Sequence, residues 1–452
     1  MTRAFAPLRP QPGIALQEVT QPNLIREVFS YSRVPALQFD GAEVPLSPAP
    51  ELWITDTTFR DGQQAREPYT VEQIVRMFDL LHALDGETGL IRQSEFFLYT
   101  EKDRAALEAV LARGHRYPEV TSWIRAVKSD FQLVKAAGVK ETGILTSCSD
   151  YHIFNKLNMT RSEALAFYLE IVDAALDAGI KPRCHFEDLT RADVEGFALP
   201  FAEALMNRAA QANVPIKIRL CDTMGVAVPW AAAALPRSVP KLVRAFVERA
   251  GVPSQQLEWH GHNDLFKVHA NSVSAWLYGC SAINATLLST GERTGNSPLE
   301  AAVVEYVGLT GDQGSVDLRV LTEIGTYMRD ECGVPVPAGY PLLGSEFNVT
   351  RAGIHADGLL KDEEIYNVFD TKRLLGRPVG VSVNDKSGAA GVAFWVRQRL
   401  GLEGDARVEK HDPGIEAMYT AIQRQYETGR ASALTQVELL ALAREHLAER
   451  FA

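Results

Sequence analysis

The stretch His260-Gly261-His262-Asn263-Asp264 determines which other parts of the chain are expected to lie close together. It follows Leu257-Glu258-Trp259, which is typical of a short strand. Side chains alternate between the two faces of a strand, so Glu258, His260 and His262 should point the same way. Two imidazoles roughly 7 Å apart along one face can share a metal ion only if other ligands complete its shell. Two other stretches offer such ligands: Asp56-Thr57-Thr58-Phe59-Arg60-Asp61-Gly62 and Gly291-Glu292-Arg293-Thr294-Gly295-Asn296.

The bulk composition is that of a globular enzyme and excludes several other classes. The chain has 452 residues and a net charge of −11, which argues against a general nucleic-acid surface. No apolar run is long enough for a membrane span, and no signal layout opens the chain. The five cysteines stand singly, without a CxxC pair, which favours a reducing, cytoplasmic setting over disulfides or a thiolate metal site. They are Cys148, Cys184, Cys221, Cys280 and Cys332.

From residue 52 onward, short apolar runs alternate with helical patterns. The spacing predicts eight strand–helix units between 52 and 310, which fit a closed parallel (β/α)8 TIM barrel of the α/β class. A doubly wound open sheet is the alternative, but no glycine-rich turn of the dinucleotide-binding type follows the first strand. The predicted strands lie near Trp53–Asp56, Ile91–Phe97, Val120–Ile124, Thr142–Thr146, Pro182–Phe186, Ile216–Cys221, Leu257–His262 and Ala282–Leu288.

Capping boxes mark where several of the helices should begin. Two are Thr70-Val71-Glu72-Gln73 and Thr160-Arg161-Ser162-Glu163, each followed by a helical apolar pattern. A third is Ser297-Pro298-Leu299-Glu300, in which a proline would occupy the first helical position. These signals place helices directly after predicted strands, as a barrel requires.

Four regions are expected along the chain. Residues 1–50 are rich in proline and should form an N-terminal arm, with one short helix near Leu24–Tyr31. The barrel should occupy 51–320, and a linker or subdomain 321–400. A C-terminal, mostly helical extension should occupy 401–452. The boundary after the barrel is expected between 310 and 340.

The barrel brings the three opening stretches together, because active groups of TIM barrels lie at the carboxyl ends of the strands. Asp61 follows the first strand, His260 and His262 end the seventh, and Asn296 follows the eighth. Strands seven, eight and one are neighbours in a closed barrel. These oxygen and nitrogen ligands would suit Zn²⁺, Mn²⁺ or Mg²⁺ with open positions for a substrate. The alternative is a strand end whose imidazoles bond only to the backbone.

Other polar residues near the same rim are candidates for chemistry. Arg60, beside Asp61, could stabilise an enolate or alkoxide oxygen, or form a plain ion pair. On strand five, Glu187 could act as a base and Arg183 could clamp an anion, but an Arg–Glu layer filling the barrel explains them equally well. Glu258 could orient an imidazole from below.

Two further segments are weaker signals. The loop Thr146-Ser147-Cys148-Ser149-Asp150-Tyr151-His152 follows strand four, where substrates bind in barrels, although serine and aspartate are common in any loop. His355 and Tyr366 lie outside the barrel, and in isolation they are typical of packing residues.

Four motifs, in this order, carry a resemblance to a known family. They are DTTFRDGQQ (56–64), HGHND (260–264), GERTGN (291–296) and GIHADG (353–358) with Tyr366 after it. The chain over roughly 52–400 resembles the metal-dependent acyl-CoA Claisen synthases, which include the isopropylmalate, homocitrate, citramalate and re-face citrate synthases. 3-Hydroxy-3-methylglutaryl-CoA lyase is a more distant cousin. Residues 1–50 and the segment SCSDYHIFNKL (147–157) look more like the branch of re-face citrate, phosphonomethylmalate and phosphinomethylmalate synthases.

The resemblance implies roles for individual residues. Asp61, His260, His262 and Asn296 resemble the ligands of a divalent cation, which could be Mn, Mg, Co or Zn. Arg60 looks like the catalytic arginine, and Glu187 is similar to an acidic residue of the substrate pocket. His355 and Tyr366 look like residues supplied by a neighbouring subunit, which implies a homodimer whose C-terminal region crosses to the other barrel. The expected substrate contacts are Gln64, Glu95, His152, Arg183, Arg219 and Thr223.

The resemblance also implies a reaction. Acetyl-CoA would condense with a 2-oxo acid, and CoA would be released by hydrolysis of the thioester. The favoured acceptor has a second anionic group, as oxaloacetate or phosphonopyruvate has, and Arg183 and Arg219 could read that group. An isopropylmalate or homocitrate synthase is the alternative. A lyase is disfavoured because GERTGN stands where the lyase's cysteine-bearing loop is expected. A non-catalytic metal-binding protein is the third hypothesis.

Overall fold

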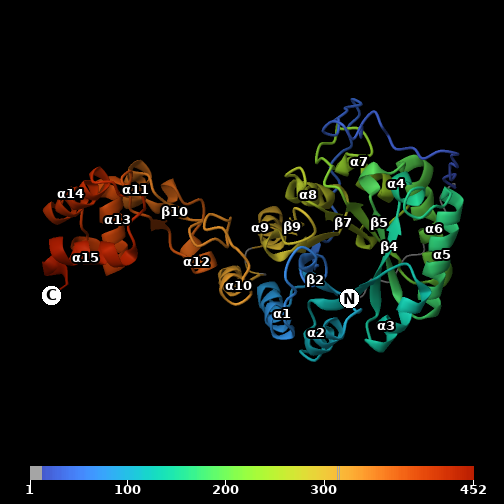
Figure 1. Cartoon of the computed structure of the whole chain (residues 1–452), viewed down its shortest axis with the longest axis horizontal. Helices are drawn as coiled ribbons and strands as arrows, with labels where there is room; N and C mark the ends of the chain where they lie inside the picture. Colours follow the sequence, from blue (N-terminus) through green and yellow to red (C-terminus); the bar gives the residue numbers. More distant parts are fainter. Residues whose placement is uncertain (1–12, 313, 315, 452) are drawn as a thin grey trace. The chain divides into compact units, whose positions relative to one another are not determined.

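The computed structural model describes residues 13–312, 314 and 316–451, and these form two compact units that divide between Asp317 and Leu318. The first unit is a closed parallel barrel, coloured blue to yellow in Figure 1. Its strands pair in sequence order from β1 to β8, and β1 also pairs with β8, which closes the sheet. The TIM barrel predicted from the strand–helix rhythm is therefore confirmed, and the open sheet is wrong.

The observed strands agree with the predicted runs to within two residues at each end. They are β1 (Trp53–Asp56), β2 (Ile91–Phe96), β3 (Glu119–Ile124), β4 (Glu141–Ser147), β5 (Lys181–Glu187), β6 (Lys217–Asp222), β7 (Leu257–Gly261) and β8 (Ala282–Thr286). A two-residue strand, β9 (Ser297–Pro298), pairs with the end of β8. Closure rests on the register Trp53 with Ala282 through Asp56 with Ala285.

Helices follow the strands around the outside of the barrel (Figure 1). They are α1 (Val71–Asp85), α2 (Glu101–Leu111), α3 (Phe131–Ala136), α4 (Asp150–Ile153), α5 (Arg161–Asp177), α6 (Leu199–Ala212), α7 (Val239–Glu248), α8 (Val268–Tyr278) and α9 (Leu299–Thr310). The capping boxes of Thr70 and Thr160 are formed, each with both reciprocal hydrogen bonds. These boxes fix where two helices start after the barrel's loops.

The third predicted capping box is wrong. Helix α9 begins at Leu299, and its N-cap is Pro298, which makes no side-chain cap. Ser297 instead belongs to β9, where it pairs with Ala285. The Glu300 carboxylate accepts a hydrogen bond from the backbone N–H of Leu288 rather than from an N-cap residue. A backbone pairing with β8 has thus replaced the local cap.

The N-terminal arm, from residue 13 to residue 50, is bound along the barrel through backbone and side-chain hydrogen bonds. Arg161 donates to the carbonyl oxygen of Gln17 at 2.7 Å, and the backbone N–H of Asn23 donates to the Asp150 carboxylate at 2.7 Å. Residues 26–28 form a single turn, so the short helix expected near Leu24–Tyr31 is not present. Residues 1–12 of the arm lie outside the described part of the chain.

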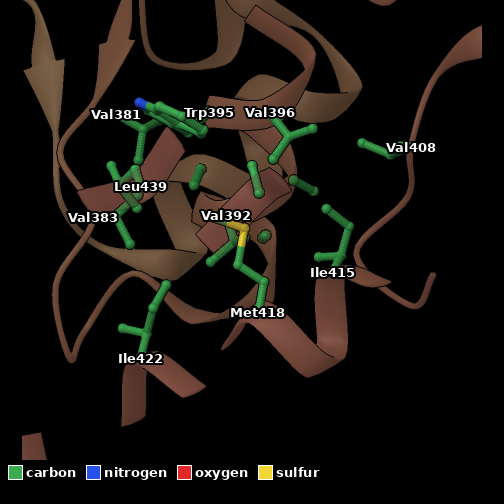
Figure 2. Packing of buried hydrophobic residues seen from close by; sticks show 14 of the residues in the cluster. Val381, Val383, Val392, Trp395, Val396, Val408, Ile415, Met418, Ile422 and Leu439 are labelled. Carbon is green, nitrogen blue, oxygen red and sulfur yellow. The ribbon is translucent and has the colours of Figure 1, made fainter. Parts of the chain in front are cut away.

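The second unit has its own core and is mostly helical. It contains α10 (Arg319–Asp330), α11 (Gly353–Lys361), α12 (Thr371–Leu375), α13 (Gly388–Leu400), α14 (Pro413–Glu427) and α15 (Gln436–His446), with a small parallel pair of β10 (Val349–Thr350) and β11 (Gly380–Val381). Figure 2 shows Val392, Val396, Ile415 and Met418 packed together in this core, where each is fully buried. No helix of the described residues is long and apolar enough to cross a membrane.

Candidate active site

The stretches 56–62, 260–264 and 291–296 converge at the carboxyl rim of the barrel. The Oδ2 atom of Asp61 lies 3.5 Å from His260 Nε2 and 3.9 Å from His262 Nε2, and the two imidazole nitrogens lie 3.3 Å apart. All three side chains are buried, and their ligand atoms lie within 4.8 Å of one another. Among the described residues, this is the one group of histidine, cysteine and acidic side chains with metal-binding geometry.

The histidines are prepared to act as neutral ligands. His260 Nδ1 lies 2.7 Å from Asn284 Oδ1, and the Asn284 amide nitrogen donates to the Thr55 carbonyl oxygen, so the oxygen faces the imidazole. His260 must then donate from Nδ1, which leaves the lone pair of Nε2 facing the cluster. Burial, followed by the charge of His262, lowers the pKa of His260 to about 3. Neutral imidazole is the form that binds a cation.

Asp61 reaches the histidines from the tight loop after β1. Arg60 lies 3.4 Å from its carboxylate, and the backbone N–H of Glu292 donates to Oδ1 at 3.2 Å. Burial alone would raise the pKa of Asp61, but the charge of Arg60, together with the hydrogen bond from the backbone N–H of Glu292, holds it below its usual value. The carboxylate is therefore ionised, as a cation ligand must be.

Asn296 also lies at this site. Its Nδ2 donates to the Thr290 carbonyl oxygen at 3.1 Å, while its buried Oδ1 has no hydrogen-bond partner among the described residues. A Cβ atom built on Gly291 would lie 2.1 Å from Asn296 Nδ2 and 3.3 Å from Asp61 Oδ1. A glycine is needed there so that the loop can bring the amide near the carboxylate. The unpaired oxygen and the neutral imidazoles fit a divalent cation.

Below this rim, charged side chains fill the barrel interior as an ion-pair layer. Glu95 accepts from Arg60 Nε at 2.7 Å, and it pairs with Arg183 at 2.8 Å and with Arg219 at 2.7 Å. Burial would raise the pKa of Glu95, but the three guanidinium charges lower it to about 2. Glu258 accepts two further bonds from Arg219. It thus braces an arginine, rather than an imidazole as the sequence suggested.

This layer bears on the substrate contacts that were expected at Arg183 and Arg219. Both side chains have no exposed surface, and both are committed to buried carboxylates. The alternative considered from the sequence, an Arg–Glu layer filling the barrel, describes them as the structure shows them. Glu95 is likewise fully buried, but its contact with Arg60 lets it hold that guanidinium at the rim.

A second polar group surrounds Glu187, where β4 and β5 end. Its carboxylate lies 3.0 Å from His152 Nδ1 and 3.1 Å from Lys156 Nζ, and it accepts a bond from the Ser147 hydroxyl. Burial would raise the pKa of Glu187, but the hydrogen bond and charge of His152, with Ser147 and Lys156, lower it to about 2. A carboxylate so well paired is a weak proton acceptor.

The remaining predicted residues are dispersed. The Thr223 hydroxyl accepts a bond from the backbone N–H of Asp188 at 2.8 Å, close to Glu187 in sequence. Gln64 follows the 3-10 turn Asp61–Gln63 and is exposed, whereas Asp61 and Gly62 are buried. His355 and Tyr366 belong to the second unit, where both are exposed and their ring centroids lie 4.3 Å apart. His355 is therefore an exposed residue beside a tyrosine ring, and it is not packed in the core of this unit.

Sequence reasoning missed Asn284 and Lys156. Asn284 lies on β8, two residues after Ala282, which pairs with Glu258 on β7, so a register argument could have found it. Lys156 lies four residues after His152 in the loop after α4. A lysine in a loop carries no such signal, because its partner depends on how the loop folds.

This fold and rim define the class of the protein: a TIM barrel with a buried carboxylate–bis-histidine cluster at its carboxyl face. The HMGL-like family matches residues 51–327, and the chain belongs to that family.

Named relatives cover nearly the whole chain. It is 54% identical to a citrate (Re)-synthase of Syntrophus aciditrophicus, over 96% of this chain and 69% of that one. It is 51% identical to a citrate (Re)-synthase of Clostridium kluyveri, over 94% of each chain. A 2-phosphinomethylmalate synthase of Streptomyces hygroscopicus is 38% identical, over 94% of this chain and 97% of that one.

Among solved structures, a hydroxymethylglutaryl-CoA lyase from Pseudomonas aeruginosa superposes with a TM-score of 0.50 at 19% identity. It covers 64% of this chain and 95% of the lyase. At that identity the likeness supports the shared fold alone.

Proposed function

We propose that this protein condenses acetyl-CoA with a 2-oxo acid that has a second anionic group, with oxaloacetate as the favoured acceptor, and releases CoA. The observation that supports the proposal is the convergence of Asp61, His260 and His262 at the rim of a barrel whose relatives are named citrate (Re)-synthases. Asp61, His260, His262 and the free oxygen of Asn296 would hold a divalent cation. When bound, it would supply Lewis acidity toward the oxygens of the 2-oxo acid.

Arg60 would stabilise negative charge on the thioester oxygen as the methyl group of acetyl-CoA loses a proton. Its guanidinium is fixed through Nε by Glu95, lies beside Asp61, and is 7% exposed. A cation held in place and shielded from water stabilises a developing charge without having to reorganise. The buried carboxylate of Glu95 is thus a positioning group for Arg60.

The proton acceptor we favour is His355, together with Tyr366, supplied by a neighbouring subunit. Glu187 was the other candidate from the sequence, but its lowered pKa makes it a poor base. His355 Nδ1 lies 3.2 Å from the Thr350 hydroxyl, which can orient the ring. Glu187, with His152 and Lys156, would instead shape the acceptor's pocket. This assignment requires a homodimer, which we also propose.

The anionic acceptor is supported by the names of the relatives and not by Arg183 or Arg219, because buried carboxylates already neutralise those two side chains. Isopropylmalate and homocitrate synthases remain as alternatives with different acceptors. In the loop after β8, the GERTGN sequence leaves no cysteine where a lyase needs one, and Cys280 is fully buried. We therefore do not favour a lyase.

The test is a thiol-release assay with acetyl-CoA, a divalent cation and a panel of acceptors. The panel contains oxaloacetate, phosphonopyruvate, pyruvate, 2-oxoisovalerate and 2-oxoglutarate. We expect CoA release with oxaloacetate, its loss on chelation and in Asp61→Asn, and incorporation of labelled acetyl groups on the re face. If no acceptor releases thiol at any metal concentration, the proposed reaction is wrong. Release with 2-oxoisovalerate alone would assign the isopropylmalate reaction instead.

A further inference from the structure

A cavity of about 310 Å³ lies between the N-terminal arm and the carboxyl rim of the barrel. The arm contributes Arg26, Tyr31 and Arg33 to its wall, and the rim contributes Tyr151, Arg191 and Leu265. Its volume is within the range of small-molecule sites, which start at about 300 Å³. Neither the cation cluster nor the Glu187 group uses this space.

The arm's side of the cavity is held in place by the barrel. The Arg237 guanidinium donates to the carbonyl oxygen of Pro35 at 3.0 Å, and the Tyr151 hydroxyl donates to that of Leu24 at 2.7 Å. Val28 and Phe29 are buried against Val226. Because the segment 24–35 is tied at both ends, the backbone that carries Arg26 and Arg33 is held against the barrel. In Figure 1 the arm passes over the part of the barrel that carries α4 and α7.

The cavity is positively charged within an acidic protein. Among the described residues, Arg33 makes no ion pair or hydrogen bond, and Arg26 bonds only to the Phe29 carbonyl oxygen. Arg191 is neutralised by Asp188, and the Asp264 of the wall is neutralised by Arg293. Two guanidinium groups are thus left without a counter-charge, although the chain as a whole carries −11. Arginine's planar fork suits phosphate oxygens in particular.

Aromatic rings stand beside these charges. Tyr31 is 96% exposed although it lines the cavity, and its φ of 66° is a left-handed conformation that is unusual for a bulky side chain. Tyr151 lies beneath both Arg26 and Arg191, with its ring centroid 5.7 and 4.2 Å from their guanidinium carbons. An exposed ring next to free guanidinium groups fits a ligand with both a flat heterocycle and phosphates.

The cavity adjoins the candidate active site. Asp264 of its wall is two residues from His262, and Met224 of its wall follows Thr223. Arg293 joins these two segments, because it donates to the Asp264 carboxylate and to the Thr223 carbonyl oxygen. A ligand in the cavity would therefore lie beside the segments that carry His262 and Thr223.

We propose that this cavity binds the phosphorylated adenosine end of acetyl-CoA, with Arg26 and Arg33 on the phosphates and Tyr31 against the adenine ring. The proposal rests on the proposed function, because it takes acetyl-CoA as the co-substrate. It gives the arm a role in recognising the acyl donor, separate from the chemistry at Asp61, His260 and His262.

The test uses the whole chain and measures binding apart from turnover. The probe is adenosine 3′,5′-bisphosphate, followed by calorimetry, with 5′-ADP and CoA in parallel. We expect the bisphosphate to bind, CoA to displace it, and 5′-ADP to bind more weakly. In Arg33→Ala and in Arg26→Ala, the Kd of the bisphosphate and the KM of acetyl-CoA should each rise about tenfold. The kcat and the KM of the 2-oxo acid should not change.

The matched control is Arg116→Ala. Arg116 is also exposed and also lies over a tyrosine ring, at 5.1 Å, but it precedes β3 at the opposite end of the barrel. It should leave both constants unchanged, and Arg33→Lys should recover part of the affinity lost in Arg33→Ala. Unchanged constants in both alanine variants, or bisphosphate binding that CoA does not displace, would overturn the proposal. Bisphosphate binding displaced by CoA, without thiol release from any acceptor, would support the cavity and refute the proposed reaction.

Discussion

At the residue level, the hydrogen bond between His260 and Asn284 determines which imidazole nitrogen faces Asp61. Replacing Asn284 by alanine removes the acceptor at 2.7 Å and frees the ring to change its tautomer. We expect divalent-cation affinity to fall by about 10- to 100-fold, as is usual when a partner of a metal-binding histidine is removed. Competition with a chromophoric chelator measures this.

Asn271→Ala is the control for that change, since Asn271 is equally buried but donates to the Ala227 carbonyl oxygen and to no histidine. It should lower the melting temperature without changing cation affinity. Equal losses of affinity in the two variants would show that stability, and not ring orientation, was being measured.

Glu187 offers a pH-dependent test at the same scale. Its pKa is lowered from 4.5 to about 2 in the folded protein, so its ion pairs contribute stability above the unfolded pKa. That contribution should shrink as the pH falls below 4.5 and should vanish as the pH passes through 2. We expect Glu187→Gln to cost about 1 to 3 kcal/mol at pH 7. The cost should decline between pH 4.5 and 3, as measured by urea unfolding of both proteins. A cost that grows on acidification would contradict the assignment.

Residues also show where the sequence was insufficient. The metal candidates could be found because strand order alone places β7, β8 and β1 side by side. The partners of Arg183 and Arg219 could not be found from the sequence. An inward-facing arginine contacts a substrate if it lies near the rim and a buried carboxylate if it lies deeper in the barrel. That depth depends on strand tilt and register, which a single sequence does not determine.

At the level of elements, the loop Gly291–Asn296 controls the geometry of the site. A Cβ atom on Gly295 would lie 1.8 Å from the Ser289 carbonyl oxygen, and its φ is 88°. We expect Gly295→Ala to cost about 2 to 4 kcal/mol through overpacking and backbone strain. It should also weaken cation binding, since the loop carries Asn296. Thermal unfolding and chelator competition check the two effects.

Gly311→Ala provides the comparison for that loop. Gly311 also has a positive φ, of 71°, but a Cβ atom added there would have nothing within 4 Å. This variant should cost only the strain of the left-handed backbone, about 1 to 2 kcal/mol, and should leave cation affinity unchanged. If the two variants behave alike, close packing around Gly295 is not what shapes the site.

Some helices and strands could be predicted from the sequence and others could not, depending on whether neighbouring residues or distant ones determine where they begin. Strands and the Thr70 and Thr160 caps were accessible because apolar runs and capping residues act over a few neighbours. The start of α9 was not, because Ser297 pairs with β8, a contact that the local sequence does not encode. The turn at 26–28 takes its shape from the barrel beneath it, and no local helix forms there.

At the scale of the whole molecule, the division into two units leaves two barrels whose active site His355 could enter: that of its own chain or that of a neighbouring subunit. The barrel unit ends at Asp317, while His355 and Tyr366 belong to the following unit. The rings of His355 and Tyr366 are 4.3 Å apart and exposed, beside the exposed side chains of Ile354 and Val368. These apolar side chains would be covered if the segment docked on a neighbouring subunit, as the proposed homodimer requires.

Subunit complementation shows whether His355 completes the active site of its own chain or that of the other subunit. Asp61→Ala inactivates the barrel's cluster, and His355→Ala removes the proposed base, so each homodimer should be inactive. If His355 crosses between subunits, a heterodimer has one site with both lesions and one that is intact. Equal mixing after subunit exchange should then restore about a quarter of wild-type activity, because half of the dimers are mixed and each has one working site. If each chain completes its own active site, every site keeps one lesion and mixing restores no activity.

Mixing Asp61→Ala with His260→Ala is the control, since each barrel of a mixed dimer then carries a lesion and no recovery is expected under either arrangement. Activity is read as CoA release, and subunit exchange is followed separately by pull-down of one tagged variant, so that a failure to exchange is not mistaken for a site built from one chain.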